Sequence, residues 1–263
     1  MKVVAIFLAL CYSCTYAQQS STSLGSFRFD GRNATPATTV FKENSSGLIF
    51  YKADFDLDAD GNPFAYHPKN TGLLHNANGS DGNGVISPSV VAYVGGNPYI
   101  QKATDPAPGY YLSMTSLQLQ QFATTYARRY VHPDSVTYFV LPGNKFTNHG
   151  IRMGDIGLVY NTQNNKYAYA IYADSGPGKI IGEGSTLLAK KLGIPVRINS
   201  SGRIRGGLDT GDVLYVVFPN SGNGPKGYPT LNDAQVTELG KKAIKNFGNE
   251  QQLIQRILDN YKN

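Results

Sequence analysis

Two acidic residues in the middle of the chain, Asp174 and Glu183, have the types and the surroundings that acid/base chemistry needs. The sequence around them, residues 167–192, reads YAYAIYADSGPGKIIGEGSTLLAKKL. Side-chain alternation predicts a strand that ends at Asp174, where Ser, Gly and Pro break it. Glu183 lies between two glycines, just before a short helix expected over 187–192. Carboxylates at the rim of ordered elements, beside glycines that let a substrate approach the backbone, suit a general acid and a general base.

The same two residues also fit an ordinary loop. Asp and Glu are common in loops, so Asp174 could begin a turn and Glu183 could be solvated. In a tight hairpin around 176–177, Glu183 would lie several residues beyond the register of Asp174. At about 3.3 Å per residue that separation is too large for cooperation. The pair can cooperate only if the connection is an open loop or if the chain bends back.

A second acidic stretch, residues 52–60, lies upstream and reads KADFDLDAD. Strict alternation places its charged residues on one face and its apolar residues on the other. Carboxylates in a row on one face repel each other unless a cation lies over them. Three interpretations stay open: a groove for a cationic substrate, a solvated edge strand that prevents aggregation, and a calcium loop that begins at Asp56. The calcium loop is incomplete, because His67 stands where such a loop needs a bidentate Glu.

These motifs together resemble the fungal-type chitosanases, glycoside hydrolase family seventy-five. The resemblance rests on YADSGPGKIIGEGSTLLAKKLG, on the acidic strand, and on a repeated Gly-Asp turn, Gly154-Asp155 and Gly211-Asp212, each expected directly before an apolar strand. It spans about residues 47–220. It implies a six-stranded double-psi β-barrel-like core and inverting hydrolysis of chitosan, a cationic glycan. It makes Asp174 and Glu183 the essential pair. The substrate-binding residues that we expect on this basis are Lys52, Asp54, Asp56, Asp58, Tyr172 and Ser185.

We assign Glu183 as general acid and Asp174 as general base, and the reverse assignment stays open. The chain has no Gly-x-Ser-x-Gly, no His-Glu-x-x-His and no phosphate loop, so paired carboxylates are the chemistry that remains. We expect no cofactor and no metal. Three alternative functions remain, and each depends on different residues. A lytic transglycosylase would need one acid, a non-catalytic glycan-binding module would not need Glu183, and a calcium-dependent adhesion module would need Asp56, Asp58 and Asp60.

Composition and patterning divide the chain into four parts. The 29 Gly, 14 Pro and 18 Tyr among 263 residues favour a mainly β fold with some α. Residues 1–17 resemble a signal peptide, 18–46 a mobile, irregular leader, and 47–220 the catalytic β-barrel. Residues 221–263 read as a linker and C-terminal amphipathic helices, packed on the barrel or used for contact with a partner. A capping box and apolar spacing predict a further helix over Thr115–Tyr130.

The signal peptide predicts a secreted, extracellular protein. Both cysteines, Cys11 and Cys14, fall inside it, so the mature chain is expected to have no disulfide. The net charge of +6 is scattered, without the basic stripe and interleaved aromatics that nucleic-acid binding needs. We therefore expect a monomer that binds a polysaccharide, with no nucleic acid and no membrane span.

Overall fold

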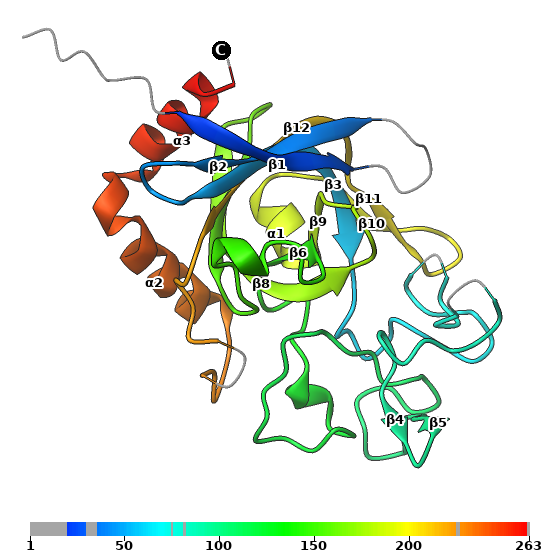
Figure 1. Ribbon diagram of the computed structural model, residues 1–263. Helices are drawn as coiled ribbons and strands as arrows, with labels where there is room; N and C mark the ends of the chain where they lie inside the picture. The colour runs from blue at the N-terminus through cyan, green and yellow to red at the C-terminus, as the bar shows by residue number, and fades with distance from the viewer. Residues whose placement is uncertain (1–19, 30–35, 75, 81–82, 225–226, 262–263) are drawn as a thin grey trace, which may run out of the picture.

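The computed structural model describes residues 20–29, 36–74, 76–80, 83–224 and 227–261 (Figure 1). Six strands form a closed barrel, because the last strand of the sheet, β9, pairs back onto β3. The expected mainly β fold with a six-stranded barrel and C-terminal helices is confirmed. In their order around the barrel the strands are β3 (Ile49–Asp58), β12 (Leu208–Phe218), β7 (Ile156–Asn161), β8 (Lys166–Gly176), β6 (Tyr138–Pro142) and β9 (Glu183–Ser185).

Two further strands extend the sheet beyond β3, namely β1 (Ser21–Arg28) and β2 (Ala37–Glu43). The interpretation of residues 18–46 as an irregular leader was therefore wrong. Threonine-rich segments favour strands, and here they pair in an antiparallel register while Phe27 and Val40 are buried in the barrel core. The expected signal peptide, 1–17, lies outside the described residues.

The inward face of the barrel strands forms one apolar core. Tyr51 and Tyr215 stack at its centre, with ring centroids 4.8 Å apart. The Tyr215 hydroxyl donates to the carbonyl of Asp54 at 3.1 Å. The core also holds Phe55, Phe139, Tyr172, Val159, Val213 and Val217.

The C-terminal helices lie on the outer face of the barrel (Figure 1): the first packs over β7 and β8, and the second lies beside β2, where its Arg256 is 3.4 Å from Glu43. They are α2 (Asp233–Ile244) and α3 (Glu250–Asp259), joined by the 3-10 turn η3 (Lys245–Phe247), and each helix begins with an Asn capping box. Gly240 lies directly on the ring of Tyr169, where a Cβ atom would come within 2.1 Å. The Tyr169 hydroxyl donates to Glu250 at 2.9 Å. Both helices are thus an integral part of the fold.

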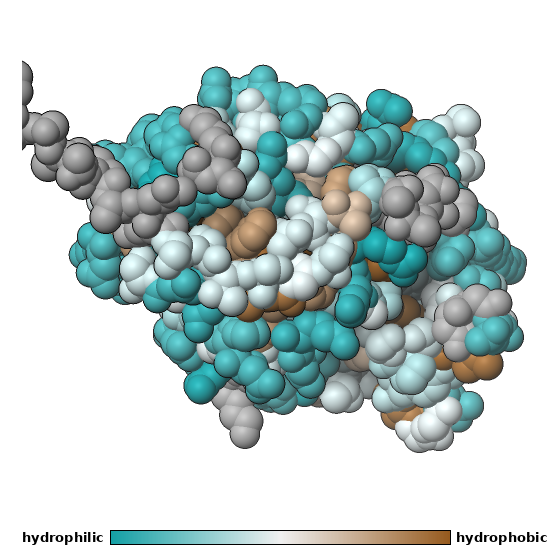
Figure 2. Space-filling view, turned by 45° about the horizontal axis from the view of Figure 1, so that its top comes forward, coloured by the Kyte–Doolittle hydropathy of each residue, from teal (hydrophilic) through white to brown (hydrophobic). Residues whose placement is uncertain are grey.

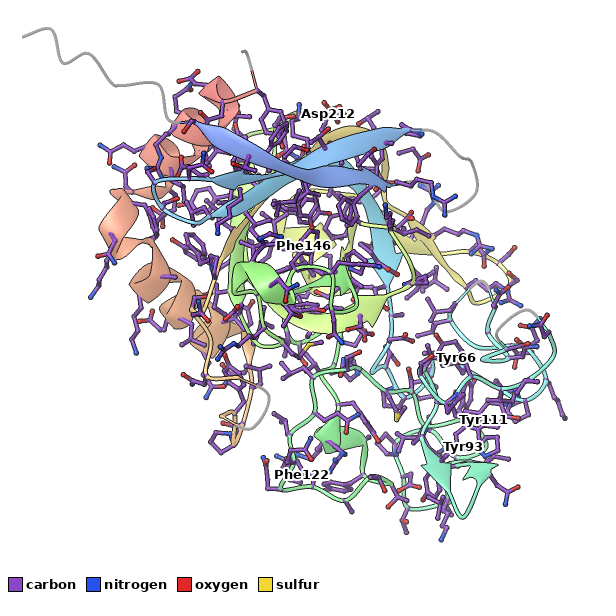
Figure 3. All side chains as sticks on the ribbon, viewed as in Figure 1. Tyr66, Tyr93, Tyr111, Phe122, Phe146 and Asp212 are labelled. Carbon is purple, nitrogen blue, oxygen red and sulfur yellow. The ribbon has the colours of Figure 1, made fainter. Side chains whose placement is uncertain are left out.

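The described residues between β3 and β6, which are 59–74, 76–80 and 83–135, form a lobe built mostly of turns beside the barrel (Figure 1). Its regular elements are β4 (Tyr93–Val94), β5 (Asn97–Pro98) and the 3-10 turn η1 (Ala127–Arg129). Figure 3 shows Tyr66, Tyr93 and Tyr111 together in this lobe, while Phe146 lies at the barrel. The lobe has small apolar cores of its own, around Tyr66 and Val91 and around Leu112 and Tyr130.

The helix expected over Thr115–Tyr130 was wrong. The Thr115 hydroxyl donates to the carbonyl of Leu117 and accepts the N–H of Val131, so it closes a loop instead of capping a helix. The apolar side chains at helical spacing are used separately. Leu119 is buried, whereas Tyr126 is 46% exposed.

One of the two Gly-Asp pairs precedes its strand as expected. Asp155 is buried before β7 and accepts the N–H groups of Arg152, Asn220 and Gly222 at 2.8–3.1 Å. The other pair, Gly211-Asp212, lies inside β12, where the register shifts between Leu208 and Val213. The repeated turn before a strand is therefore present only once.

The remaining elements are the 3-10 turn η2 (Thr147–His149), the helix α1 (Thr186–Lys191) and the hairpin of β10 (Val196–Ile198) and β11 (Ile204–Gly206). The short helix after Glu183 is thus confirmed, and Ser185 caps it. None of the described helices has the length and apolar character to cross a membrane. The face in Figure 2 is mostly hydrophilic, with apolar residues in small areas.

Candidate active site

One row of residues crosses four strands of the barrel. Val140 on β6 is the register partner of Asp174 on β8 and of Glu183 on β9, and Glu183 is in turn opposite Asp56 on β3. With strands about 4.8 Å apart, the Cα atoms of Asp174 and Glu183 are about 10 Å apart, on either side of β6. The connection between them is an open loop that crosses to the far side of β6. This is the arrangement in which the two carboxylates can cooperate.

A bulge in β8 turns Asp174 onto this face. Tyr172 pairs with Phe139 and Asp174 pairs with Val140, so Ala173 is an extra residue in β8. With strict alternation Asp174 would follow Tyr172 into the barrel interior, and a shift of one residue moves its side chain to the opposite face. Alternation read from the sequence did not predict this shift, because the bulge depends on the partner strand.

Two more aspartates join Asp174 in a compact cluster. One carboxylate oxygen from each of Asp58, Asp60 and Asp174 lies within 4.8 Å of the others, and all three residues are buried. The N–H of Asp60 donates to Asp58 Oδ1 at 2.7 Å. The lobe supplies donors to Asp60 Oδ1, namely the Tyr66 hydroxyl at 2.6 Å and the Ser113 hydroxyl at 3.3 Å. The acidic site therefore lies where the barrel meets the lobe.

The carboxyl groups of this site differ in proton affinity. Burial raises the pKa of Glu183 well above its usual range, and the negative charges of Asp58 and Asp174 raise it further. Burial also raises the pKa of Asp174, but only to about 6, because hydrogen bonds from Ser116 and Ser175 stabilise its ionised form. Environments that separate the pKa values of two carboxyls are how enzymes obtain an acid and a base from one residue type. Here they favour Glu183 as the proton donor and Asp174 as the acceptor.

Comparison with known protein families independently assigns the chain to a family. A family model described as fungal chitosanase of glycosyl hydrolase group 75 matches residues 109–256, more than half of the chain. The chain belongs to this family. It is therefore a glycoside hydrolase of chitosanase type, and the interpretation as a non-catalytic binding module is set aside. No curated protein matches the chain.

The match to the fungal chitosanases has limits that differ from the expected 47–220. It includes α2 and part of α3, which the sequence had set apart from the catalytic domain. It begins after the acidic strand β3, so Asp54, Asp56 and Asp58 lie outside it. Asp174 and Glu183 lie inside it.

The expected substrate-binding aspartates lie at different depths in this chitosanase-type site. Asp56 is exposed beside Glu183, whereas Asp54 and Asp58 are buried. Asp54 lies against Gly182, whose φ of 99° and close approach require glycine, since a Cβ atom there would be 2.1 Å from Asp54 Oδ1. Alternation along β3 thus located the acidic face but not the depth of each carboxylate.

Three other expected substrate-binding residues are not available to a glycan at this site. Tyr172 is buried in the barrel interior, where its ring stacks on Phe139. Ser185 is fully buried, and its hydroxyl oxygen already accepts the N–H groups of Leu188 and Tyr138. Lys52 lies six residues before Asp58 on β3, about 20 Å away at the usual rise per residue. The structure does not bring Lys52 to the acidic cluster.

Within the described part of the chain, Asp58, Asp60 and Asp174 are also a group that could hold a metal ion. The calcium loop considered from the sequence would have used Asp56, which is exposed and lies outside this group. Burial raises the pKa of Asp58 to about 7, and the charge of Asp174 adds to the effect. Burial and the charge of Asp58 raise that of Asp60 well above its usual range. Bound protons therefore reduce the repulsion that a cation would otherwise have to neutralise.

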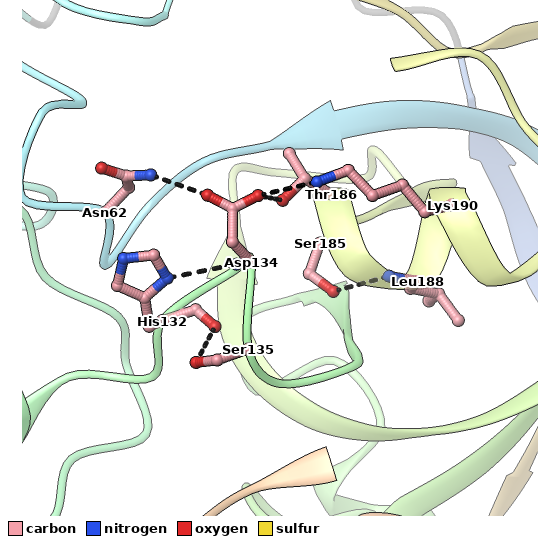
Figure 4. A network of polar contacts seen from close by, with 8 residues as sticks. All are labelled: Asn62, His132, Asp134, Ser135, Ser185, Thr186, Leu188 and Lys190. Atoms are coloured by element: carbon pink, nitrogen blue, oxygen red, sulfur yellow. Dashed lines mark hydrogen bonds and ion pairs between the residues drawn. The ribbon is translucent and has the colours of Figure 1, made fainter. Parts of the chain in front are cut away.

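A polar network centred on Asp134 holds the lobe against α1 (Figure 4). Its carboxylate accepts hydrogen bonds from Thr186 at 2.6 Å, Asn62 at 3.0 Å and Lys190 at 3.3 Å. Thr186 directly follows β9, so the network positions the strand that carries Glu183. No sequence pattern indicated Asp134, since its partners are distant in the chain.

Proposed function

We propose that the protein is a secreted, endo-acting chitosanase that cleaves β-1,4 linkages of chitosan with inversion at the anomeric carbon. The observation that carries the proposal is the placement of Asp174 and Glu183 in register on either side of β6. Membership in the fungal chitosanases supports the substrate class.

The proposed mechanism follows from the two environments. Glu183 holds its proton because it is buried among other carboxylates, and it protonates the glycosidic oxygen as the bond to the anomeric carbon breaks. Asp174 accepts a proton from the water that attacks the opposite face of the sugar ring. Inverting glycosidases separate their two carboxyls by about 6.5–9.5 Å to leave room for that water. A backbone separation of two strand spacings is compatible with this range.

The charge of the site suits a cationic substrate. Asp54, Asp56, Asp58 and Asp60 follow one another at alternate positions, and the row meets Glu183 at Asp56. Ammonium groups of an amino-sugar polymer would interact favourably with the exposed Asp56, and with Asp58 once it loses its proton near pH 7, although the whole chain carries a net charge of +6. Local fields in a cleft affect binding more than the total charge does.

The test is the release of reducing ends from chitosan, chitin, cellulose and peptidoglycan by the mature chain. We expect release from chitosan, and losses of about 10²–10⁴-fold in Asp174→Asn and in Glu183→Gln, the usual contribution of one acid or base. Cleavage of peptidoglycan without release of reducing ends, retained in Asp174→Asn, would favour a lytic transglycosylase with one acid. Mass spectrometry of the secreted protein tests removal of residues 1–17, and sedimentation tests the expected monomer.

A further inference from the structure

Ser116 reaches Asp174 from outside the barrel. Its main-chain N–H and its hydroxyl both donate to Asp174 Oδ1, at 3.0 Å and 2.6 Å. The N–H of Ser175 donates to the same oxygen at 2.8 Å and also lies 3.1 Å from Ser116 Oγ. Because Oδ1 already accepts three hydrogen bonds, Oδ2 is the oxygen left to take a proton from water.

The residue next to Ser116 completes the bulge in β8. Ala173 is the residue that has no partner on β6, and its carbonyl accepts the N–H of Leu117 at 2.8 Å. Buried backbone groups need such partners, so this contact stabilises the shifted register that turns Asp174 toward Glu183. Two consecutive residues of the lobe thus hold the backbone of Ala173 and the side chain of Asp174.

We propose that Ser116 is a positioning residue for the reaction: it fixes Asp174 Oδ1 and presents Oδ2 to the attacking water. The inference rests on the proposed role of Asp174 as general base. Ser116 itself is exposed, whereas the carboxylate that it contacts is buried.

Burial is what raises the pKa of Asp174. The titratable groups of the described residues around it are the carboxyls of Asp58, Asp60 and Glu183 and the phenols of Tyr66, Tyr138 and Tyr172, and none of these groups supplies a positive charge. The hydrogen bonds from Ser116 and Ser175 are what oppose burial and lower the pKa of Asp174. Removing the Ser116 hydroxyl should therefore raise that pKa.

The test compares Ser116→Ala with Ser116→Thr, which keeps a hydroxyl, and with Ser201→Ala as a matched control. Ser201 is exposed in the turn between β10 and β11, and its hydroxyl donates to Asn199 at 2.8 Å. For Ser116→Ala we expect the acidic limb of the kcat/KM profile to move up by about one pH unit. Activity should then fall about tenfold at pH 5, with a smaller loss near pH 7 and KM within about twofold. Ser116→Thr should recover most of the activity, and the control should match the wild type.

The proposal is overturned if Ser116→Ala keeps the wild-type pH profile and kcat, or if it loses activity equally at every pH together with melting temperature. Ser116→Cys, which keeps the side-chain size with a weaker donor, replaces Ser116→Ala if the latter does not fold. A carbon-13 NMR titration of the aspartate carboxyls, with Asp174→Asn to assign the signal, measures the same pKa without turnover. An inactive wild type would contradict the proposed function, whereas an unchanged Asp174 titration in Ser116→Ala would contradict the role of Ser116.

Discussion

Asp58 gives the most direct prediction about stability. Its side chain is buried, and burial together with the charge of Asp174 raises its pKa from 3.8 to about 7. The native state therefore binds a proton between about pH 4 and pH 7 that the unfolded chain releases. The stability that this carboxyl contributes is fully present below its pKa in the unfolded chain and is lost as the pH rises through its pKa in the folded protein. The loss of stability from Asp58 is therefore complete above about pH 7.

The size of the effect follows from the shift. About three pKa units at 1.36 kcal/mol each amount to up to about 4 kcal/mol, a large part of the 5–15 kcal/mol that holds a typical domain together. Asp58→Asn removes the titration and keeps an oxygen that can accept the N–H of Asp60, now 2.7 Å from Asp58 Oδ1. The variant should be more stable than the wild type at pH 8 and should gain little at pH 4.

Urea unfolding at pH 4, 5, 6, 7 and 8 measures this difference. Asp56→Asn is the matched control, because Asp56 is two residues away on the same strand face but exposed. It should leave the pH dependence of stability close to that of the wild type. Equal pH slopes in Asp58→Asn and wild type would refute the assignment of a buried, protonated Asp58.

Three further predictions concern the loop before Glu183, the C-terminal helices and metal. Gly182→Ala should lower the free energy of unfolding by more than about 2 kcal/mol, because φ is 99° there and the new Cβ atom would be 2.1 Å from Asp54 Oδ1. Gly178→Ala, where φ is 58° and the space is open, should lower it by about 1 kcal/mol in the same thermal melt. Truncation after Asn220 should abolish cooperative unfolding by circular dichroism, because it removes five buried aliphatic side chains worth roughly 10 kcal/mol together; a folded remainder would show that the barrel is stable alone. EDTA should leave chitosan hydrolysis unchanged, and a loss that calcium restores would instead assign the buried aspartate cluster to a metal.

Local patterns were enough to predict much of the fold. Alternation predicted the strand before Asp174, the sequence after Glu183 predicted a short helix where α1 lies, and amphipathic spacing within residues 221–263 predicted α2 and α3. Each of these signals lies within a few residues of the element that it predicts. The threonine-rich β2 was missed, because its burial comes from pairing with β1 and β3 and not from its own composition.

The site was predictable in residue type but not in arrangement. Asp174 and Glu183 stand out by their glycine-rich surroundings, yet their common register with Val140 depends on strand order around the barrel. Asp60 and Ser116 join the site through contacts between distant segments, which leave no periodic signal. Such contacts become visible only once the lobe is placed against the barrel.

The anomeric form of the first product tests the central claim most directly. Proton NMR during the early hydrolysis of chitosan distinguishes the two outcomes before mutarotation mixes them. Asp174 and Glu183, separated by β6 with room for a water molecule, predict the α-anomer as the initial product and its absence with Asp174→Asn or Glu183→Gln. Initial formation of the β-anomer would contradict the account, because retention requires a nucleophilic carboxylate about 5 Å from the acid.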